Sequence, residues 1–269
     1  HDAYDEHFAL EAHLHDARQK LCRDLHTSLR PPREEAPDLG AAVETLRGCD
    51  RLFLDLGAHD GDTLRTFFRS GSSEGGGLAN WTRQLEEDTA SFCGLGVEPS
   101  PTLASRLRAT VAELSHLNEV ATLPYAVSDA DSVAPLFFGG DSQVGNSLRF
   151  EAPDVFLAGN DFRAADVNTV RLSTLLDRLA LALKHLVVKM DIEGAEYLAL
   201  RDVLASGTLC GLVAGGAQVD LLLEEHRYMR DFFDPDAPPD ALRAYVHALR
   251  SCGVRAFLDQ HHGRAGLTD

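Results

Sequence analysis

The residues whose types and spacing suggest chemistry begin with an acidic, glycine-containing turn at residues 55–63, DLGAHDGDT. Gly57 and Gly61 allow a tight turn and a close approach of the backbone to a ligand. The GxGxxG spacing of dinucleotide sites is absent, and the three acids would repel a pyrophosphate, which binds bare amides at a positive helix end. The turn therefore favours a cationic ligand without phosphate, such as S-adenosylmethionine (SAM), although a plain strand-to-helix connection could carry the same glycines.

Two more acids follow apolar runs. Glu98 precedes Pro99 at the end of FCGLGVE, where an acid in this kind of fold can accept both hydroxyls of a ribose. It lies about 40 residues after the glycines rather than about 20, and the Gly- and Ser-rich stretch 71–77 accounts for the excess. A surface acid before a helix is the competing interpretation. Asp191 follows the apolar run 186–190, and a carboxylate at the carboxyl end of a buried parallel strand points into the ligand crevice.

The next predicted strand ends in Glu224-Glu225-His226, which should lie beside Asp191 at the same sheet edge. Asp191, Glu224 and His226 are therefore the catalytic candidates, with His226 as a possible general base. In a second interpretation, Asp191, Glu224 and Glu225 could hold a divalent cation such as Mg²⁺. In a third, the group is only a solvated strand end.

Alternating strands and helices must position these groups. Strands are predicted at residues 51–57, 92–98, 121–127, 133–138, 186–191, 219–224 and 254–258, and a short segment at 170–177 leads into a Leu-rich helix. Other helices are predicted from Asp62 or Thr63 to about Ser70, from Ser100 and Pro101 onward, around 195–204, and from Asp240 to Gly253. The alternation predicts an α/β fold with a mainly parallel sheet covered by helices on both faces.

The chain is predicted to divide into an N-terminal helical extension, residues 1–45, and one α/β domain, residues 46–269. Apolar residues recur at near-helical spacing through residues 1–30, and a Pro-Pro pair ends the helix. Because the chain begins with His1, we expect a preceding segment to have been removed. A glycosylation sequon at Asn80 leaves the lumen of the secretory pathway (Golgi) open beside the cytoplasm.

The net charge, the apolar runs and the cysteine spacing of the chain argue against several classes of protein. The net charge of −17 argues against nucleic acid as the main partner, because a polyanion would be repelled. No apolar run reaches the roughly 20 residues of a membrane span. The five cysteines show no CxxC spacing, which leaves a zinc or redox motif without support, and their odd number leaves at least one thiol unpaired within a monomer. The sequence does not settle the oligomeric state.

The order of DLGAHDGDT, GVEPSP, YAVSDADS, VRLSTLLD and VKMDIEGAEYLAL over about residues 50–226 resembles the FkbM-type methyltransferase domain, and KMDIEGAE is its most specific part. The resemblance implies a Rossmann-like class I methyltransferase sandwich and O-methylation by SAM, often of a sugar or polyketide-like hydroxyl. It implies that Asp55, Gly57, Gly61, Glu98 and Asp191 line the SAM site. His59 and Asp60 stand where Asn followed by Ile or Val is more usual.

With their neighbours and with Ser128 and Asp129, which the resemblance implies lie near the adenine, these residues form the expected cofactor set: Asp55, Gly57, Ala58, His59, Gly61, Asp62, Thr63, Glu98, Pro99, Ser128, Asp129 and Asp191. The acceptor is expected to be a small molecule or glycan, preferably a neutral sugar. Asn146 and Ser147, in a Gly-rich loop, could contact SAM or the acceptor or simply form a turn. A nucleotide-dependent oxidoreductase and a non-catalytic SAM-binding module are the alternatives.

Overall fold

The computed structural model describes residues 33–34, 37–69, 89–139, 146–149, 162–179, 181–224, 226, 230–235, 237–238 and 240–259. The chain divides into two compact units, His1–Arg33 and Glu34–Asp269, and the sites discussed below belong to the second. The short strand β1 (Arg33–Glu34) spans the division. The helix predicted at 1–30 and the sequon at Asn80 lie outside the described residues, and the domain boundary predicted at residue 45 stays a prediction.

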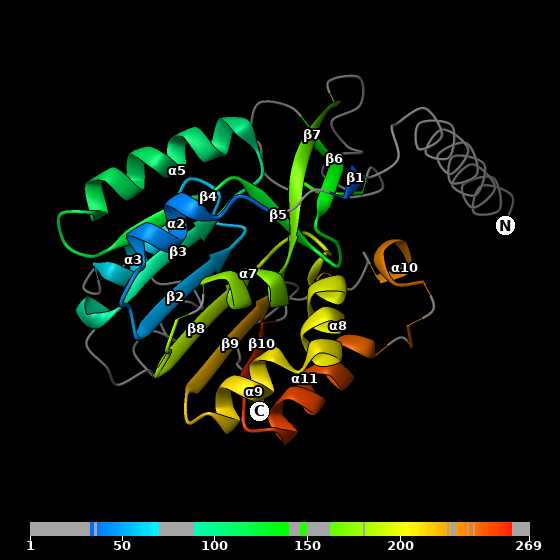
Figure 1. The fold of residues 1–269 in the computed structure, drawn as a ribbon. Coiled ribbons are helices and arrows are strands. Elements are labelled where there is room, and N and C mark those ends of the chain that lie inside the picture. The colour runs from blue at the N-terminus through cyan, green and yellow to red at the C-terminus, as the bar shows by residue number, and fades with distance from the viewer. Residues whose placement is uncertain are drawn as a thin grey trace, which may run out of the picture. The chain divides into compact units, whose positions relative to one another are not determined.

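The centre of the second unit is a six-stranded parallel sheet with the order β10-β9-β8-β2-β3-β4 (Figure 1). Its strands are β2 (Arg51–Leu56), β3 (Cys93–Val97), β4 (Val120–Leu123), β8 (His185–Met190), β9 (Gln218–Glu224) and β10 (Arg255–Asp259). The apolar runs of β2 and β8 are buried on both faces, as expected inside a parallel sheet.

The order of these strands places a topological switch point in the middle of the sheet. The chain builds outward from β2 through β3 to β4, and then restarts at β8 on the opposite side of β2. In open α/β sheets, ligands bind outside the carboxyl ends of the strands at such a point. The α/β fold class predicted from the sequence is confirmed.

Helices flank this sheet. On one face, α3 (Asp62–Phe68) and α5 (Pro101–Leu114) pack over an apolar cluster in which the rings of Phe53 and Phe67 stack with centroids 3.9 Å apart. Ser100 caps α5, as predicted, whereas Asp240 precedes α11 without a side-chain capping bond. The other helices are α2 (Gly40–Thr45), η1 (Thr89–Ser91), α7 (Leu172–Leu179), α8 (Glu196–Ser206), α9 (Thr208–Ala214), α10 (Arg230–Phe233) and α11 (Ala241–Ser251).

A second, smaller sheet corrects two predictions. The strand predicted at 121–127 is two strands in different sheets, because β5 (Tyr125–Ser128) leaves β4 after Pro124, which lacks an N–H for the ladder. β5 pairs in parallel with β7 (Phe162–Arg171), which pairs antiparallel with β6 (Ser132–Gly139). The short segment predicted at 170–177 is therefore the end of a long strand followed directly by helix α7.

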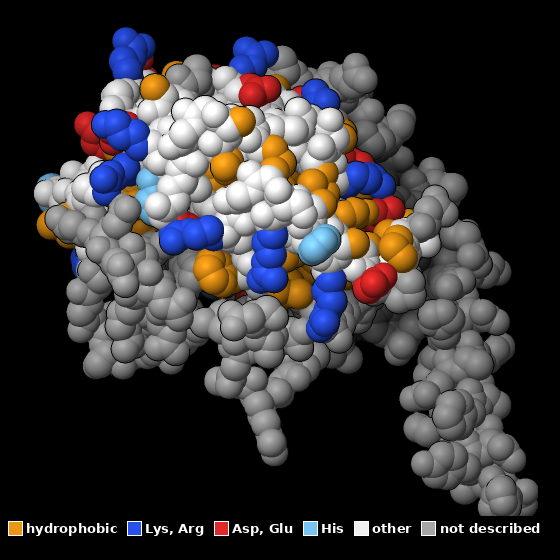
Figure 2. All heavy atoms as spheres, turned by 90° about the horizontal axis from the view of Figure 1, so that it is seen from below, with side chains coloured by type: hydrophobic (Ala, Val, Ile, Leu, Met, Phe, Trp, Pro, Cys, Tyr) orange, Lys and Arg blue, Asp and Glu red, His pale blue; other side chains and the backbone are white. Residues whose placement is uncertain are grey.

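The surface is uneven in charge, and it offers no simple membrane span. On the face seen from below, Lys and Arg are more prominent than Asp and Glu among the coloured side chains, although the whole chain carries a net charge of −17 (Figure 2). Within the described ranges, no single helix is long and apolar enough to cross a bilayer; only the bent pair α8 and α9, taken together, meets that test.

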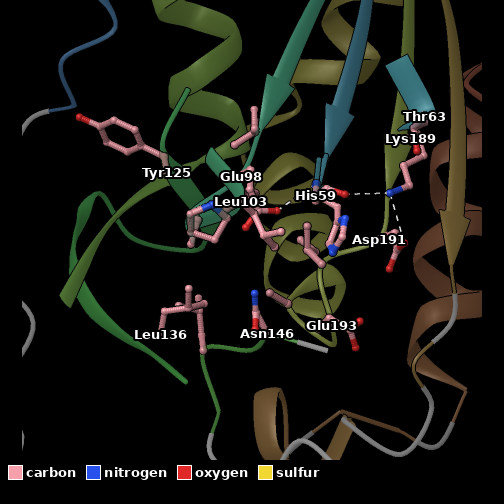
Figure 3. A pocket seen from close by; sticks show the side chains of 18 residues that line it. His59, Thr63, Glu98, Leu103, Tyr125, Leu136, Asn146, Lys189, Asp191 and Glu193 are labelled. Atoms are coloured by element: carbon pink, nitrogen blue, oxygen red, sulfur yellow. Dashed lines mark hydrogen bonds and ion pairs between the residues drawn. The ribbon is translucent and has the colours of Figure 1, made fainter. Parts of the chain in front are cut away.

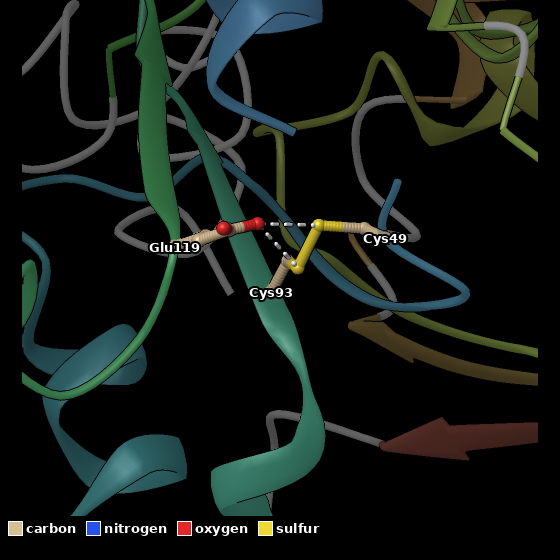
Figure 4. A group of neighbouring side chains, drawn as sticks. All are labelled: Cys49, Cys93 and Glu119. Atoms are coloured by element: carbon tan, nitrogen blue, oxygen red, sulfur yellow. Dashed lines mark hydrogen bonds between the residues drawn. A yellow bond between two sulfur atoms is a disulfide. The ribbon is translucent and has the colours of Figure 1, made fainter. Parts of the chain in front are cut away.

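Two disulfides, whose pairing the sequence left open, crosslink elements of the second unit. Cys49, just before β2, is bonded to Cys93 at the start of β3, and Cys210 in α9 is bonded to Cys252 after α11. Figure 4 shows the carboxylate of Glu119 beside the first of these disulfides. The remaining cysteine, Cys22, lies outside the described residues.

Removal of the second disulfide is expected to lower the stability of the protein measurably. The residues it joins are 42 apart in the sequence. A crosslink closing a loop of that length lowers the conformational entropy of the unfolded chain and so raises the free energy of unfolding by about 2–4 kcal/mol. In urea denaturation, the variant with Cys210→Ala and Cys252→Ala should show a lower free energy of unfolding than the wild type. Wild-type stability that does not change on adding dithiothreitol would contradict both crosslinks.

Candidate active site

A cavity of about 310 Å³ lies at the switch point, where the carboxyl ends of β2, β3 and β8 face the second sheet (Figure 3). The first sheet and the segments that follow its strands contribute Gly57, His59, Thr63, Val97, Glu98, Pro99, Leu103, Lys189, Asp191, Ile192, Glu193 and Ala195. The second sheet and the segment that returns against it contribute Tyr125, Ala126, Val127, Leu136, Asn146 and Leu148. The pocket therefore has an acidic wall and an apolar wall.

Glu98 is held rigidly at the end of β3. Its Oε2 accepts a hydrogen bond from the backbone N–H of His59 (3.1 Å), and its Oε1 accepts one from the N–H of Ser100 (2.9 Å). The side chain is 5% exposed, and burial raises the pKa of Glu98 to about 7, against the effect of these two N–H donors. Each oxygen retains a further acceptor position, so the carboxylate can bind two neighbouring hydroxyls.

Gly57 brings the loops after β2 and β8 into direct contact. Its φ of +79° lies in the left-handed region, and a Cβ at this position would lie 1.8 Å from the carbonyl oxygen of Asp191. The Lys189 ammonium donates a hydrogen bond to the carbonyl oxygen of Gly57 (3.1 Å). His59 also has a positive φ, 51°, without being glycine. The conformation of the turn therefore depends on close backbone packing as well as on the conformational freedom of glycine.

Lys189 joins two acids at the floor of the site. Its Nζ lies 3.5 Å from Asp55 Oδ1 and 3.2 Å from Asp191 Oδ2. Burial and the charge of Asp191 raise the pKa of Asp55 to about 6, although Lys189 opposes the shift. Burial also acts to raise the pKa of Asp191, but Lys189 and His226 outweigh it and hold that pKa below its ordinary value. Asp191 is therefore ionised at neutral pH.

His226 lies in a ring of carboxylates at the end of β9. Its Nδ1 is 3.1 Å from Glu196 Oε1, and its Nε2 is 3.4 Å from Glu193 Oε2 and 3.8 Å from Asp191 Oδ1. Burial disfavours the charged ring, but these acids outweigh it and raise the pKa of His226 to about 10. The acids around the ring therefore favour its protonated form, and a role for His226 as a general base stays a prediction. Burial and Asp191 raise the pKa of Glu224 to about 8.

The structure brings together half of the cofactor residues expected from the sequence. Gly57, His59, Thr63, Glu98, Pro99 and Asp191 all line the pocket.

The other half lie outside the lining, for separate reasons. Asp55 is fully buried beneath Lys189, Ala58 is buried in the core, and Gly61 precedes α3 and packs against Thr110. Asp62 is exposed and pairs with Arg65, Asp129 pairs with Arg201, and Ser128 lies one residue beyond the last lining residue of β5.

The catalytic candidates lie close together, and one of the two loop residues lines the pocket. Asp191, Glu224 and His226 gather at the ends of β8 and β9, while Glu225 lies outside the described residues. Asn146 lines the pocket, and its amide atoms are buried without a hydrogen-bond partner among the described residues. Ser147 instead donates a hydrogen bond from its hydroxyl to the carbonyl oxygen of Glu193 (3.0 Å).

Lys189 and the apolar wall were not predicted from the sequence. Lys189 is one of only three lysines, and it stands inside an otherwise apolar strand, a signal that was available in the sequence. The wall formed by Tyr125, Ala126 and Val127 was missed because β5 was assigned to the main sheet.

Comparisons with known proteins give one match. The family model described as the methyltransferase FkbM domain matches residues 55–255, which include all the residues that line the pocket. Neither the curated proteins nor the solved structures contain a match.

Proposed function

Since the chain belongs to the FkbM methyltransferase family, and is thus a methyltransferase, we propose that it uses SAM to methylate a hydroxyl group of a sugar, a glycan or another small polyhydroxy acceptor. The observation that carries the proposal is the pairing of two carboxylates, Glu98 and Asp191, across one pocket at the strand switch point. The two carboxylates of this pocket suit a ligand that carries both a positive charge and a pair of neighbouring hydroxyl groups.

The residues present fit SAM. Glu98 would hold the two ribose hydroxyls, since both of its oxygens are fixed by backbone N–H groups and still have acceptor capacity. The apolar wall of Ala126, Val127 and Leu136 would pack against the adenine, and Asp191 would lie near the cationic end of the cofactor. When bound, SAM supplies a methyl group activated by a sulfonium. The protein must then mainly position the acceptor and receive its proton.

Asp191 is the residue we assign to that proton. It is ionised, lines the pocket and has one oxygen turned toward Lys189 and the other toward His226. A weak base is sufficient here, because a hydroxyl becomes strongly acidic as its oxygen gains a methyl group. Lys189 and His226 keep Asp191 charged and oriented, and they are positioning residues in this account.

A screen of acceptors tests the proposal. The full chain is incubated with SAM carrying a tritiated methyl group and a panel of neutral sugars, glycans and polyols, and transfer is followed by radioactivity and by mass. Label appearing as a methyl ether on a hydroxyl supports the proposal. SAM binding without transfer to any acceptor would favour a non-catalytic SAM-binding module, and label on nitrogen or carbon would contradict O-methylation.

SAM affinity is expected to fall as the pH falls below about 7. Bound SAM favours the ionised form of Glu98, whose pKa in the free protein is about 7, so binding at lower pH must expel a proton. Asp55 and Lys189, the charged groups that act on Glu98, partly offset each other. Calorimetry should show the Kd rising about tenfold between about pH 7 and about pH 5.5, a window in which the SAM amine stays charged. A similar rise in Glu98→Gln would contradict this assignment.

A further inference from the structure

We propose that Asp191, Glu224 and His226 form a binding site for one divalent cation of the Mg²⁺ or Mn²⁺ type at the carboxyl ends of β8 and β9. Each residue can offer one ligand atom, and the three atoms lie within 4.8 Å of one another. Two carboxylate oxygens and one imidazole nitrogen form a set that such ions accept, with the remaining coordination positions left to water or substrate.

The orientation of His226 supports the site. The ring is 4% exposed, and its Nδ1 lies against Glu196, whose Oε1 also accepts a hydrogen bond from the backbone N–H of Ile192 (2.7 Å). That contact directs Nε2 toward Asp191 and Glu193. A carboxylate behind the second nitrogen of a histidine is the usual arrangement at metal sites, where it fixes the ring and its tautomer.

The negative charge around His226 also supports a cation site. Around His226 lie the carboxyls of Asp191, Glu193, Glu196 and Glu224, while Lys189 contacts the oxygen of Asp191 that faces away from the ring. Glu196 is fully buried, and its Oε2 has no hydrogen-bond partner within the described part of the chain. Clustered buried carboxyl groups are costly unless they are paired, and a divalent cation would add positive charge among these four acids.

The cation would lie at the wall of the pocket. Asp191 lines the cavity, whereas Glu224 and His226 are not among the lining residues. An acceptor hydroxyl in the pocket could then take an open coordination position, and the metal would lower its pKa. This role in catalysis rests on the proposed function, but binding of the cation does not.

Titration with Mn²⁺ tests the site directly. The full chain is treated with EDTA, freed of chelator and titrated with MnCl₂, while the electron paramagnetic resonance signal of free Mn²⁺ is followed. We expect one equivalent to bind, and we expect Glu224→Gln and His226→Asn each to weaken binding by at least about tenfold. Glu119→Gln is the control, because Glu119 is an exposed acid beside the Cys49–Cys93 disulfide, and it should bind Mn²⁺ as the wild type does.

Three outcomes would overturn the proposal: a wild-type protein that binds no Mn²⁺, binding unchanged in both variants, or binding lost in Glu119→Gln. Circular dichroism of each variant shows whether it has folded, and because two variants probe the same site, one that misfolds does not remove the test. SAM affinity is measured separately on the chelated protein. SAM binding without Mn²⁺ binding refutes the cation site alone, and the reverse refutes the cofactor assignment alone.

Discussion

Asp191→Asn is expected to lower kcat by about 100- to 10,000-fold, the range typical of removing a group that receives a proton in the transition state. The substitution keeps the size of the side chain but removes the charge that lies 3.2 Å from Lys189 and faces the pocket. The measurement is steady-state methyl transfer with an acceptor from the screen. Turnover close to that of the wild type would remove Asp191 from the mechanism.

A matched control separates this effect from a general loss of negative charge. Asp62 belongs to the same acidic turn of the sequence, but its side chain is 80% exposed and pairs with Arg65 outside the pocket lining. Asp62→Asn should therefore keep both kcat and SAM affinity near the wild-type values. A large loss in this variant would mean that SAM approaches the turn from a different side.

Gly57→Ala is expected to disable the pocket. The added Cβ would lie 1.8 Å from the Asp191 carbonyl oxygen, so the loop after β8 must move and carry Asp191 with it. We expect SAM affinity to fall at least about tenfold, and we expect the free energy of unfolding to fall by more than the roughly 1–2 kcal/mol that left-handed backbone costs a residue with a side chain. Calorimetry and urea denaturation measure the two effects.

Gly207 offers the comparison that isolates the clash. It also has a positive φ, +69°, but a Cβ added there would meet no atom within 4 Å. Gly207→Ala should therefore show only the backbone cost and bind SAM normally. Equal effects of the two substitutions would show that the contact between Gly57 and Asp191 is unimportant.

The sequence was sufficient to predict the central sheet, because apolar strands ending in acids have a simple signature. The residues that follow β2, β3 and β8 were placed at one sheet edge from this pattern, and Glu98 and Asp191 do line one pocket. Apolar periodicity did not show where the chain leaves the sheet. Pro124 was the available sign that the run 121–127 is broken between β4 and β5.

The features that could not be predicted from the sequence depend on contacts between residues that are far apart in the chain. The pKa of His226 depends on Glu196, which lies 30 residues earlier in the sequence and meets it only after β8, α8 and β9 have packed. The disulfide partners are 44 and 42 residues apart, and no local pattern pairs them. Asp62 and Asp129 looked equivalent to the other acids in the sequence, but in the fold they pair with Arg65 and Arg201 outside the pocket lining.

The central claim is that SAM binds between the carboxylates of Glu98 and Asp191 at the strand switch point. Titration calorimetry with SAM, on the wild type and on Glu98→Ala, tests it most directly. The account predicts one equivalent of SAM bound to the wild type, no binding of NAD under the same conditions, and at least about tenfold weaker SAM binding in the variant, whose two hydroxyl acceptors are gone. An absence of heat with SAM, or an affinity unchanged by Glu98→Ala, would contradict it.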